Sequence, residues 1–429
     1  MNVKIAHVSD VHLGAWRNER LNELGFRAFQ KTIEAIIEEK VDFVIISGDL
    51  YDVSNPNVEV VDLATKLLKE LNDHDIAVYG VMGSHDFSPS NKSMMRPLIT
   101  AGLFSDVSKG IMTKENKISL EFTVDPKTKI KLTGLRARKR SLEIEDYHIL
   151  DRKALEDEKG PKIFVFHTMM SELKPKEFKD MISAPKSLLP QGFDYYAGGH
   201  LHKLLPERLK EKSFKLKINQ KNNIIYPGAI FPTDFRELER MKSGGFCLIS
   251  GDMIENNLTL EAEFKPIKVI DIENILLDCA NKSVLEVKGS LEQELYNREL
   301  QDKIVTIRIF GQLSFGKSYE IKSNDIIQMC KDKGAYDVLI NKNALTTEEY
   351  ESISIPVGKT NEEIETALIK EHATKVKISN FSSLTMEDKI HQLLNNLGEE
   401  RQIGTKVLTY NKDLEQTVRN IFEIPKSKE

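Results

Sequence analysis

The fold is decided by residues 3–12, which read Val-Lys-Ile-Ala-His-Val-Ser-Asp-Val-His. The first part predicts a short strand, and two polar side chains, Asp10 and His12, come directly after it. On an extended segment residues two apart point to the same side, so this carboxylate and this imidazole can address one ligand together. One such pair is more often a satisfied polar group than a binding site. Four later segments repeat the arrangement, and this repetition favours a site.

Two of these segments follow the next strands of the chain. Asp49 lies in Gly48-Asp49 after an apolar run, and His85 lies in Gly83-Ser84-His85-Asp86 after another. Strands and helices alternate over this region, with strands at 3–9, 41–46 and 76–81 and helices at 19–40 and 58–72. This alternation predicts a sheet covered by helices, in which ligands bind at the carboxyl ends of the strands. We therefore expect Asp10, Asp49 and His85 to converge.

The last two segments come much later in the chain. An apolar strand at 163–166 delivers His167, and a strand at 193–197 delivers Gly199-His200-Leu201-His202. His200 and His202 are again two residues apart and can face one ligand. Neutral imidazoles mixed with carboxylates suit manganese, iron or zinc, and a carboxylate can bridge two ions. The five clusters together predict a dinuclear metal site.

The alternative interpretation is that these histidines are scattered core or surface residues. The chain has ten histidines, and five of them follow strands in its first half: His12, His85, His167, His200 and His202. The alternative is reasonable for any one of them, but it is poor for all five together with Asp10 and Asp49. The other five are interpreted as structural or surface residues: His7, His74, His148, His372 and His391.

Length and composition set the class of protein. The chain has 429 residues, enough for two or three domains, and no apolar run approaches the roughly 18 residues of a membrane helix. Three widely spaced cysteines argue against a disulfide framework, and with the absence of a signal-peptide pattern they predict a cytoplasmic protein. A net charge of -5 gives no general attraction to nucleic acid, so any such binding requires local basic patches.

The patterns divide the chain into three predicted parts. Residues 1–260 hold all five clusters, and short strands at 223–226 and 245–249 are expected to complete a second sheet there. Residues 264–345 are expected to form a small α+β domain with helices at 290–300 and 324–333. Residues 356–429 are charged and helical, with apolar stripes typical of a docking module or of a small bundle.

Two further features suggest macromolecular partners. The sharpest basic cluster comprises Arg136, Arg138, Lys139 and Arg140, which could follow a phosphate backbone, although a solvated loop is the alternative. The helix at 58–71 has more apolar residues than one buried stripe needs. The surplus is consistent with a homodimer, and a core helix covered on both sides is the alternative.

The order of the motifs resembles that of a known family. Asp-x-His at 10–12, Gly-Asp-x-x-Asp at 48–52, Gly-Ser-His-Asp at 83–86, His167 and Gly-His-x-His at 199–202 are similar to the calcineurin-like metallophosphoesterases. This resemblance covers about residues 1–250 and implies an α/β fold, a four-layer αββα sandwich. Residues 5–14, 47–52 and 226–229 also resemble the SbcD-type DNA repair nucleases, known as meiotic recombination eleven. Their domain order, with a small capping domain and a helical module, is similar as well.

The resemblance implies roles for individual residues. Asp10, His12 and His202 would hold one metal, His167 and His200 would hold the other, and Asp49 would bridge them. Ser84 stands where the family usually has asparagine, so the second metal would be bound by a shorter and weaker ligand. His85 would protonate the leaving oxygen or stabilise charge on the phosphate. We expect Asp52 to orient His85, with a solvated Asp52 as the alternative.

The same resemblance implies a function. The implied function is that of a manganese-dependent DNA nuclease with two Mn²⁺ ions, 3′-to-5′ exonuclease activity and endonuclease activity on single strands. The implied partners are DNA, an SMC-like ATPase of the Rad-fifty or SbcC type, and a second copy of the chain. Two alternatives stay open. One is a phosphoesterase acting on phosphoproteins or nucleotide diesters, and the other is a DNA-end-binding scaffold in which Ser84 marks a decayed site.

Overall fold

The computed structural model describes residues 1–88, 92–241, 243–347, 365–366, 368–369, 383–398 and 407–422. The chain divides into two compact units, Met1–Glu348 and Glu349–Glu429. No helix among the described residues is long and apolar enough to cross a membrane.

The first sheet of the larger unit has seven strands in the order β11-β14-β13-β1-β2-β3-β4. Their bounds are β1 Asn2–Val8, β2 Phe43–Ser47, β3 Ala77–Val81, β4 Ser105–Asp106, β11 Lys215–Lys217, β13 Gly244–Ile254 and β14 Asn257–Ile267. Strands β1 to β4 are parallel, as the alternation of strands and helices predicts. Their carboxyl ends therefore lie at one edge of the sheet.

The second sheet has five strands in the order β12-β10-β9-β8-β7. Their bounds are β7 Thr123–Val124, β8 Lys131–Leu135, β9 Lys162–His167, β10 Tyr195–Gly199 and β12 Ile224–Ile225. Strands β8, β9, β10 and β12 are parallel. The sheets pack face to face through alternate residues, for example Ile5 and Ile45 of the first against Ile163 and Val165 of the second.

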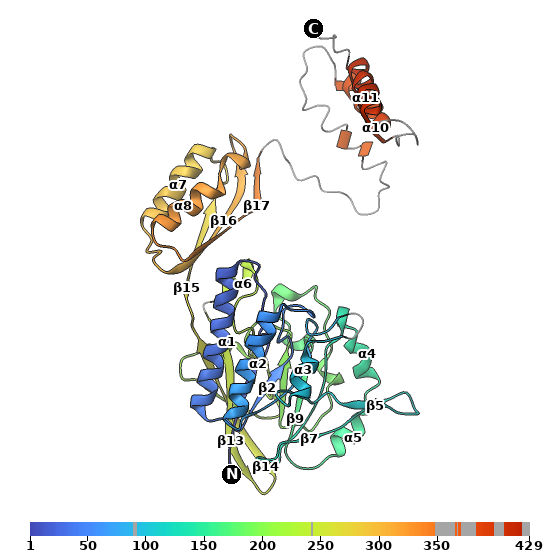
Figure 1. Ribbon diagram of the computed structural model, residues 1–429, viewed down its shortest axis with the longest axis vertical. Helices are drawn as coiled ribbons and strands as arrows, with labels where there is room; N and C mark the ends of the chain where they lie inside the picture. The colour runs from blue at the N-terminus through green and yellow to red at the C-terminus, as the bar shows by residue number, and fades with distance from the viewer. Residues whose placement is uncertain are drawn as a thin grey trace. The chain divides into compact units, whose positions relative to one another are not determined.

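Helices cover both outer faces and complete four layers (Figure 1). The other faces of β1 and β2 pack against α1 (Glu19–Glu39) and α2 (Val58–Asp73) in one core. On the outer face of the second sheet, Phe164 and Phe166 pack with Tyr147 of α4 (Glu143–His148) and Leu155 of α5 (Arg152–Asp157). The predicted αββα sandwich is confirmed.

The assignment of residues 245–249 to the second sheet is wrong. They lie in β13, which pairs antiparallel with β1 in the first sheet. Only β12, within 223–226, joins the second sheet. An apolar strand buried on both faces carries no sequence mark of which neighbour it pairs with, so this choice depends on the long-range packing.

The remaining elements of the αββα sandwich are short. They are α3 Met95–Thr100, β5 Gly110–Met112, β6 Ile118–Leu120, α6 Phe235–Arg240 and the 3-10 turns Lys139–Ser141, Ser171–Leu173, Lys176–Phe178, Lys186–Leu188 and Glu207–Lys210. Strand β14 continues the first sheet to Ile267, so strand residues lie on both sides of the expected boundary near residue 260.

Residues 271–347 form a small domain, here called the three-stranded domain. Its strands β15 (Asp271–Asp278), β16 (Lys303–Leu313) and β17 (Asp337–Thr347) are parallel, and α7 (Val284–Tyr296) and α8 (Ser323–Asp332) lie on one face (Figure 1). A 3-10 turn spans Ser318–Glu320. The predicted helix at 290–300 begins six residues earlier, because Ser283 and Glu286 cap each other's backbone N–H groups at its start.

The smaller unit contains α10 (Ser383–Gly398) and α11 (Val407–Ile421), which contact each other where Lys389 Nζ donates to Ile421 O over 2.5 Å. On α10, Leu394 and Leu397 are 38% and 48% exposed. Within the predicted helical part at 356–429, residues 356–364, 367, 370–382, 399–406 and 423–429 lie outside the described residues.

The interface between the sheets contains one fully buried histidine, His7. Its Nδ1 lies 2.6 Å from Tyr195 Oη and its Nε2 lies 2.7 Å from Ser47 Oγ. Because the Ser47 hydroxyl donates to Ala197 O, Ser47 Oγ accepts from Nε2–H, which leaves Nδ1 to accept from Tyr195. The neutral ring therefore satisfies every partner, in agreement with its structural interpretation.

Acid should destabilise the protein through His7. Burial lowers the pKa of His7 from 6.5 to about 3. Between these values the unfolded chain binds a proton that the folded chain does not, so the free energy of unfolding falls by about 3 kcal/mol as the pH falls from 7 to 4. Denaturant unfolding from pH 7 to 4 should show this loss, and His7→Gln should show a smaller one. Equal pH slopes in the two proteins would contradict the assignment.

Candidate metal centre

The five clusters meet where the carboxyl ends of the strands face one another. His200 N, after β10, donates to Asp10 Oδ1, after β1, over 3.0 Å. His167 Nδ1, at the end of β9, lies 2.7 Å from Ser47 O at the end of β2. Four non-glycine residues here have positive φ: Asp10 at 50°, His12 at 48°, Asp49 at 52° and His200 at 88°. Such backbone is strained and concentrates at functional sites.

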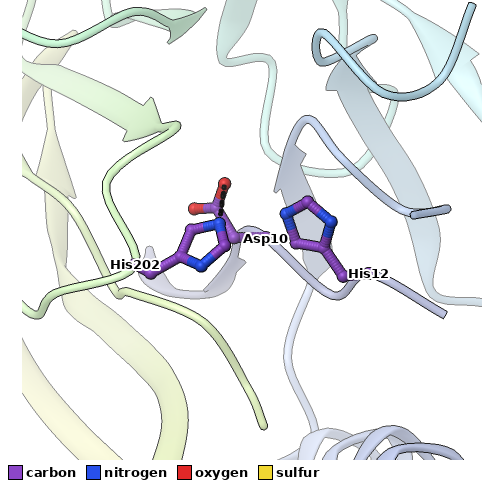
Figure 2. A group of neighbouring side chains, drawn as sticks. All are labelled: Asp10, His12 and His202. Carbon is purple, nitrogen blue, oxygen red and sulfur yellow. Dashed lines mark ion pairs between the residues drawn. The ribbon is translucent and has the colours of Figure 1, made fainter. Parts of the chain in front are cut away.

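The first group of possible metal ligands comprises Asp10, His12 and His202, whose ligand atoms all lie within 4.8 Å of one another. Figure 2 shows the three side chains approaching from two segments, with His202 facing the Asp10 carboxylate. His202 Nε2 lies 3.8 Å from Asp10 Oδ1, and the His12 and His202 ring centroids are 4.7 Å apart. This is the set that the family resemblance implies for one metal.

Asp49 lies between this group and a second one, which comprises Asp10, Asp49 and His167. Its Oδ2 is 3.1 Å from His167 Nε2 and 3.6 Å from His12 Nε2. Its Oδ1 accepts a hydrogen bond from His85 N over 2.7 Å. A carboxylate placed between the imidazoles of two groups has the position of a bridging ligand.

The side chains fit divalent metal ions in their hydrogen bonding. His12, His167 and His202 each direct Nδ1 outward, to Asp52 Oδ1 at 3.1 Å, Ser47 O at 2.7 Å and Glu237 Oε1 at 2.6 Å. Because each Nδ1–H is donated to an oxygen, each Nε2 is the nitrogen that faces the centre, and it can bind a metal ion when that ion displaces its proton, as in metal-binding histidines. Among the described residues, Asp10 Oδ2 and His12 Nε2 are buried without a hydrogen-bond partner. Such atoms are costly unless something binds them.

The electrostatics of the centre call for positive charge. Burial alone would lower the pKa of His167, but the Asp49 carboxylate raises it to about 10. Burial likewise opposes protonation of His202, and its hydrogen bond to Glu237 raises that pKa to about 9. The pKa of Asp49 lies well below its ordinary value despite burial, because His167 is beside it. A divalent cation would supply this charge in place of protons.

His200 and Ser84 are two further predicted ligands. The ring of His200 lies with its centroid 5.2 Å from that of His167, and burial, reinforced by His167, lowers its pKa to about 4. It is therefore neutral, the form that binds metals. Ser84 is half-buried in the loop after β3, beside His85. The preceding Gly83 passes so close to Asp49 that a Cβ there would overlap the carboxylate.

His85 stands at the open side of the centre, with its side chain 44% exposed. Its Nδ1 lies 2.5 Å from the backbone oxygen of Asp52 and 3.9 Å from the Asp52 carboxylate. The Asp52 carboxylate instead accepts from His12 Nδ1. Asp52 thus contacts His85 through its backbone, whereas its side chain orients a predicted metal ligand. The side chain's expected partner was His85, and the rotamer that selects His12 is set by tertiary packing.

This contact changes the outcome expected for Asp52→Ala. Loss of the carboxylate should weaken binding of one metal ion about 10- to 100-fold, because His12 loses the acceptor that fixes its tautomer. Calorimetric titration of Mn²⁺ into the metal-free protein measures this. Asp52→Asn, which keeps an acceptor oxygen, should lose less. If metal affinity is unchanged in Asp52→Ala, the Asp52 carboxylate does not support metal binding, and the role of the residue is only to orient His85.

Glu237 is the residue that the sequence analysis missed. Its Oε1 accepts from His202 Nδ1, and its Oε2 accepts from Thr233 N over 2.7 Å and Thr233 Oγ1 over 2.9 Å. It lies in α6, whose N-cap is Asp234. The spacing Asp234-x-x-Glu237 marks a helix start and could have located the helix, but not the contact with His202.

The predicted basic cluster lines a groove of about 850 Å³. The lining also includes Phe87, which follows His85 by two residues in the sequence. The Arg136 guanidinium lies 5.7 Å from the ring centroid of Phe87, and Arg138 Nη1 donates to Asp146 Oδ1 over 2.9 Å. Lys139 and Arg140 line the same groove, together with Lys109 from the edge of β5. The four predicted residues therefore share one surface.

Comparisons with known proteins agree with this arrangement. The family model described as calcineurin-like phosphoesterase matches residues 3–204. Three archaeal relatives are each named DNA double-strand break repair protein Mre11. That of Methanococcus maripaludis is 27% identical over 70% of this chain and 76% of its own length. The Methanopyrus kandleri protein is 26% identical over 71% of this chain and 64% of its own length. The Methanocaldococcus jannaschii protein is 27% identical over 85% of this chain and 87% of its own length.

Among solved structures, a dimetal phosphatase from Danio rerio matches 62% of this chain and 98% of its own, with 12% identity and a TM-score of 0.38. The family match includes β1, β2, β3, β9 and β10, the strands that deliver every candidate ligand. Proteins of this family bind divalent metals in a dinuclear site, and the described cluster has the side chains for one. The chain is therefore a metal-dependent hydrolase whose residues 3–204 match the calcineurin-like phosphoesterase family and which is similar to the archaeal Mre11 proteins.

Proposed function

We propose that this chain is a manganese-dependent nuclease that processes DNA ends in double-strand break repair, with 3′-to-5′ exonuclease activity and endonuclease activity on single strands. The observation that carries the proposal is the convergence of three Nε2 atoms and two carboxylates beside a basic groove. The names of the archaeal relatives support the biological process. The mixed imidazole and carboxylate ligands support manganese.

The residues have separate roles in this proposal. Asp10, His12 and His202 would hold one ion, His167, His200 and Ser84 would hold the other, and Asp49 would be shared between them. When bound, the metal pair supplies Lewis-acid charge to the phosphate and a hydroxide nucleophile near neutral pH. His85, exposed at the mouth and oriented through Nδ1 by Asp52 O, presents Nε2 to the departing oxygen and gives it a proton. The groove holds the substrate's backbone.

Partners follow from two further surfaces. The exposed Leu394 and Leu397 of α10 support docking of the C-terminal helices to the SMC-like ATPase of the Rad-fifty type. On α2, Val60, Ala64, Leu67, Leu68 and Leu71 are buried in the core, and Val58 is 78% exposed. This exposed residue at the start of α2 supports the homodimer, although most of the apolar surplus packs within the chain.

The proposal is tested by substrate choice. The metal-free protein is given Mn²⁺ and assayed with labelled single-stranded DNA, labelled double-stranded DNA and a chromogenic small phosphodiester. The DNA substrates are used with free ends, with the 3′ end blocked and with the 5′ end blocked. Cleavage of DNA at more than about 100 times the efficiency for the small diester is expected, because groove contacts supply binding energy that the small diester lacks. Preference for the small diester would support a nucleotide phosphodiesterase. Mn²⁺ binding with DNA binding but no cleavage would support a scaffold.

The groove has its own prediction. Lys139→Gln combined with Arg140→Gln should weaken DNA binding and reduce the slope of log affinity against log salt by about 2, since each lost phosphate contact lowers it by about 0.7 to 0.9. Fluorescence anisotropy over a salt series measures the slope. Lys66→Gln with Lys69→Gln, two exposed lysines on α2, is the control of equal charge. An unchanged slope in the groove variant would make this cluster a solvated loop.

A further inference from the structure

Helix α6 lies between the candidate metal centre and the three-stranded domain. It is anchored at its start by Asp234, whose Oδ1 accepts from Glu237 N over 2.8 Å. Leu238 is fully buried in the core of the αββα sandwich. These contacts hold the helix on one side and leave the side chains of its other faces to meet two different neighbours.

One face of α6 meets the metal centre through Glu237. Both carboxylate oxygens are used, Oε1 by His202 Nδ1 and Oε2 by the backbone and hydroxyl of Thr233. The side chain is only 21% exposed, so its rotamer is restricted on all sides. A shift of α6 would therefore move the acceptor that sets the orientation of His202 and the direction of its Nε2.

Another face meets the three-stranded domain through Phe235 and Glu239, which are four residues apart and so lie on one side of the helix. Arg308 of β16 contacts both. Its Nε and Nη2 donate to the two Glu239 oxygens over 2.8 and 2.6 Å, and its guanidinium lies 5.3 Å from the Phe235 ring centroid. Asn274 of β15 donates to Glu239 O over 2.7 Å. A bidentate arginine contact of this kind is geometrically strict.

We propose that α6 couples the docking of the three-stranded domain to the metal centre, with Glu237 as the positioning residue for His202. The Arg308–Glu239 contact holds the helix where Glu237 meets His202, and metal affinity at the Asp10, His12 and His202 group depends on it. By linkage, metal binding strengthens the docking of the domain by the same factor. A DNA or protein partner that moves the domain would thereby change the metal centre. The inference rests on the metal sites of the proposed function.

A second contact between the same domain and the sandwich provides the control. Arg20 of α1 donates to Tyr336 O, and its guanidinium lies 5.0 Å from the Tyr336 ring centroid. Tyr336 Oη in turn donates to Arg20 O over 3.3 Å. This contact also joins an arginine to an aromatic ring across the junction, but it involves α1 and not α6. It separates general loosening of the domain from an effect transmitted through α6.

The test measures Mn²⁺ binding to the metal-free full-length protein by calorimetry, with thermal unfolding in EDTA as the stability readout. Glu237→Ala should lower the affinity for one of the two Mn²⁺ ions by about 10- to 100-fold. Glu237→Gln, which keeps an acceptor oxygen for His202, should recover most of this affinity. Arg308→Met should lower the affinity for the same Mn²⁺ ion by about 3- to 10-fold. Arg20→Met should leave both ions unchanged. Adding Arg308→Met to Glu237→Ala should cause no further loss, because the two act on one contact.

Several results would overturn the inference. Equal Mn²⁺ affinity in Arg308→Met and the natural protein, or equal losses in Arg308→Met and Arg20→Met, would show that α6 transmits nothing. A fully additive double variant would separate the two contacts. A fall in unfolding temperature in EDTA without a change in Mn²⁺ affinity would make Glu237 and Arg308 structural only. Failure of the natural protein to bind two Mn²⁺ ions would instead refute the proposed metal centre.

Discussion

Asp49→Asn should lower the nuclease activity by a factor of at least about 1,000. This loss is larger than the one expected from changing a residue that only supports a metal ligand. Asp49 Oδ2 is the carboxylate oxygen that lies near imidazoles of both ligand groups, 3.1 Å from His167 Nε2 and 3.6 Å from His12 Nε2. The amide has almost the same shape but no negative charge to bridge two cations. We therefore expect the variant to bind fewer than two Mn²⁺ ions in calorimetry.

The fold should survive this change. Asparagine keeps an oxygen that can accept from His85 N, as Asp49 Oδ1 does now. Unfolding in EDTA checks this, because there the natural protein and the variant are compared without metal. Asp62→Asn on α2, whose side chain is 57% exposed, is the matched control and should retain full activity. Two Mn²⁺ ions bound normally by Asp49→Asn would remove Asp49 from the bridging position.

His85→Ala has the second largest expected effect, a fall in turnover of about 10²- to 10⁴-fold with both Mn²⁺ ions retained. The reason is its placement: Nδ1 is engaged by Asp52 O and the ring is partly exposed at the mouth of the centre. A group that donates a proton in the reaction affects the rate without holding the metals. Single-turnover DNA cleavage at saturating Mn²⁺ measures the loss, and calorimetry measures the metal content.

The structure also offers a competing role that this variant can identify. His85, His12 and Asp52 form a third group whose possible ligand atoms lie within 4.8 Å of one another. Loss of one Mn²⁺ ion in His85→Ala would make His85 a ligand and not the proton donor. His74→Ala, an exposed histidine on the C-terminal end of α2, controls for the loss of an imidazole and should change neither quantity.

The strands that deliver the candidate ligands, and the convergence of those ligands, could be predicted from the amino-acid sequence. Each signal is local, an apolar run followed within a few residues by Asp10, Asp49, His85, His167 or His200, and parallel strands bring such positions to one edge of a sheet. The buried centre also obeys a local rule, because Asp10 and His12 are two residues apart and share one group.

The side chains that support the ligands could not be predicted in this way, because they are brought together by long-range packing. Glu237 lies 35 residues from His202 and meets it because α6 packs against the centre. The Asp52 carboxylate selects His12, 40 residues away, although His85 is its expected partner. The pairing of β13 with β1 is likewise a contact between distant segments. Such contacts depend on rotamers and on packing between segments far apart in the chain, and neither leaves a periodic trace in the sequence.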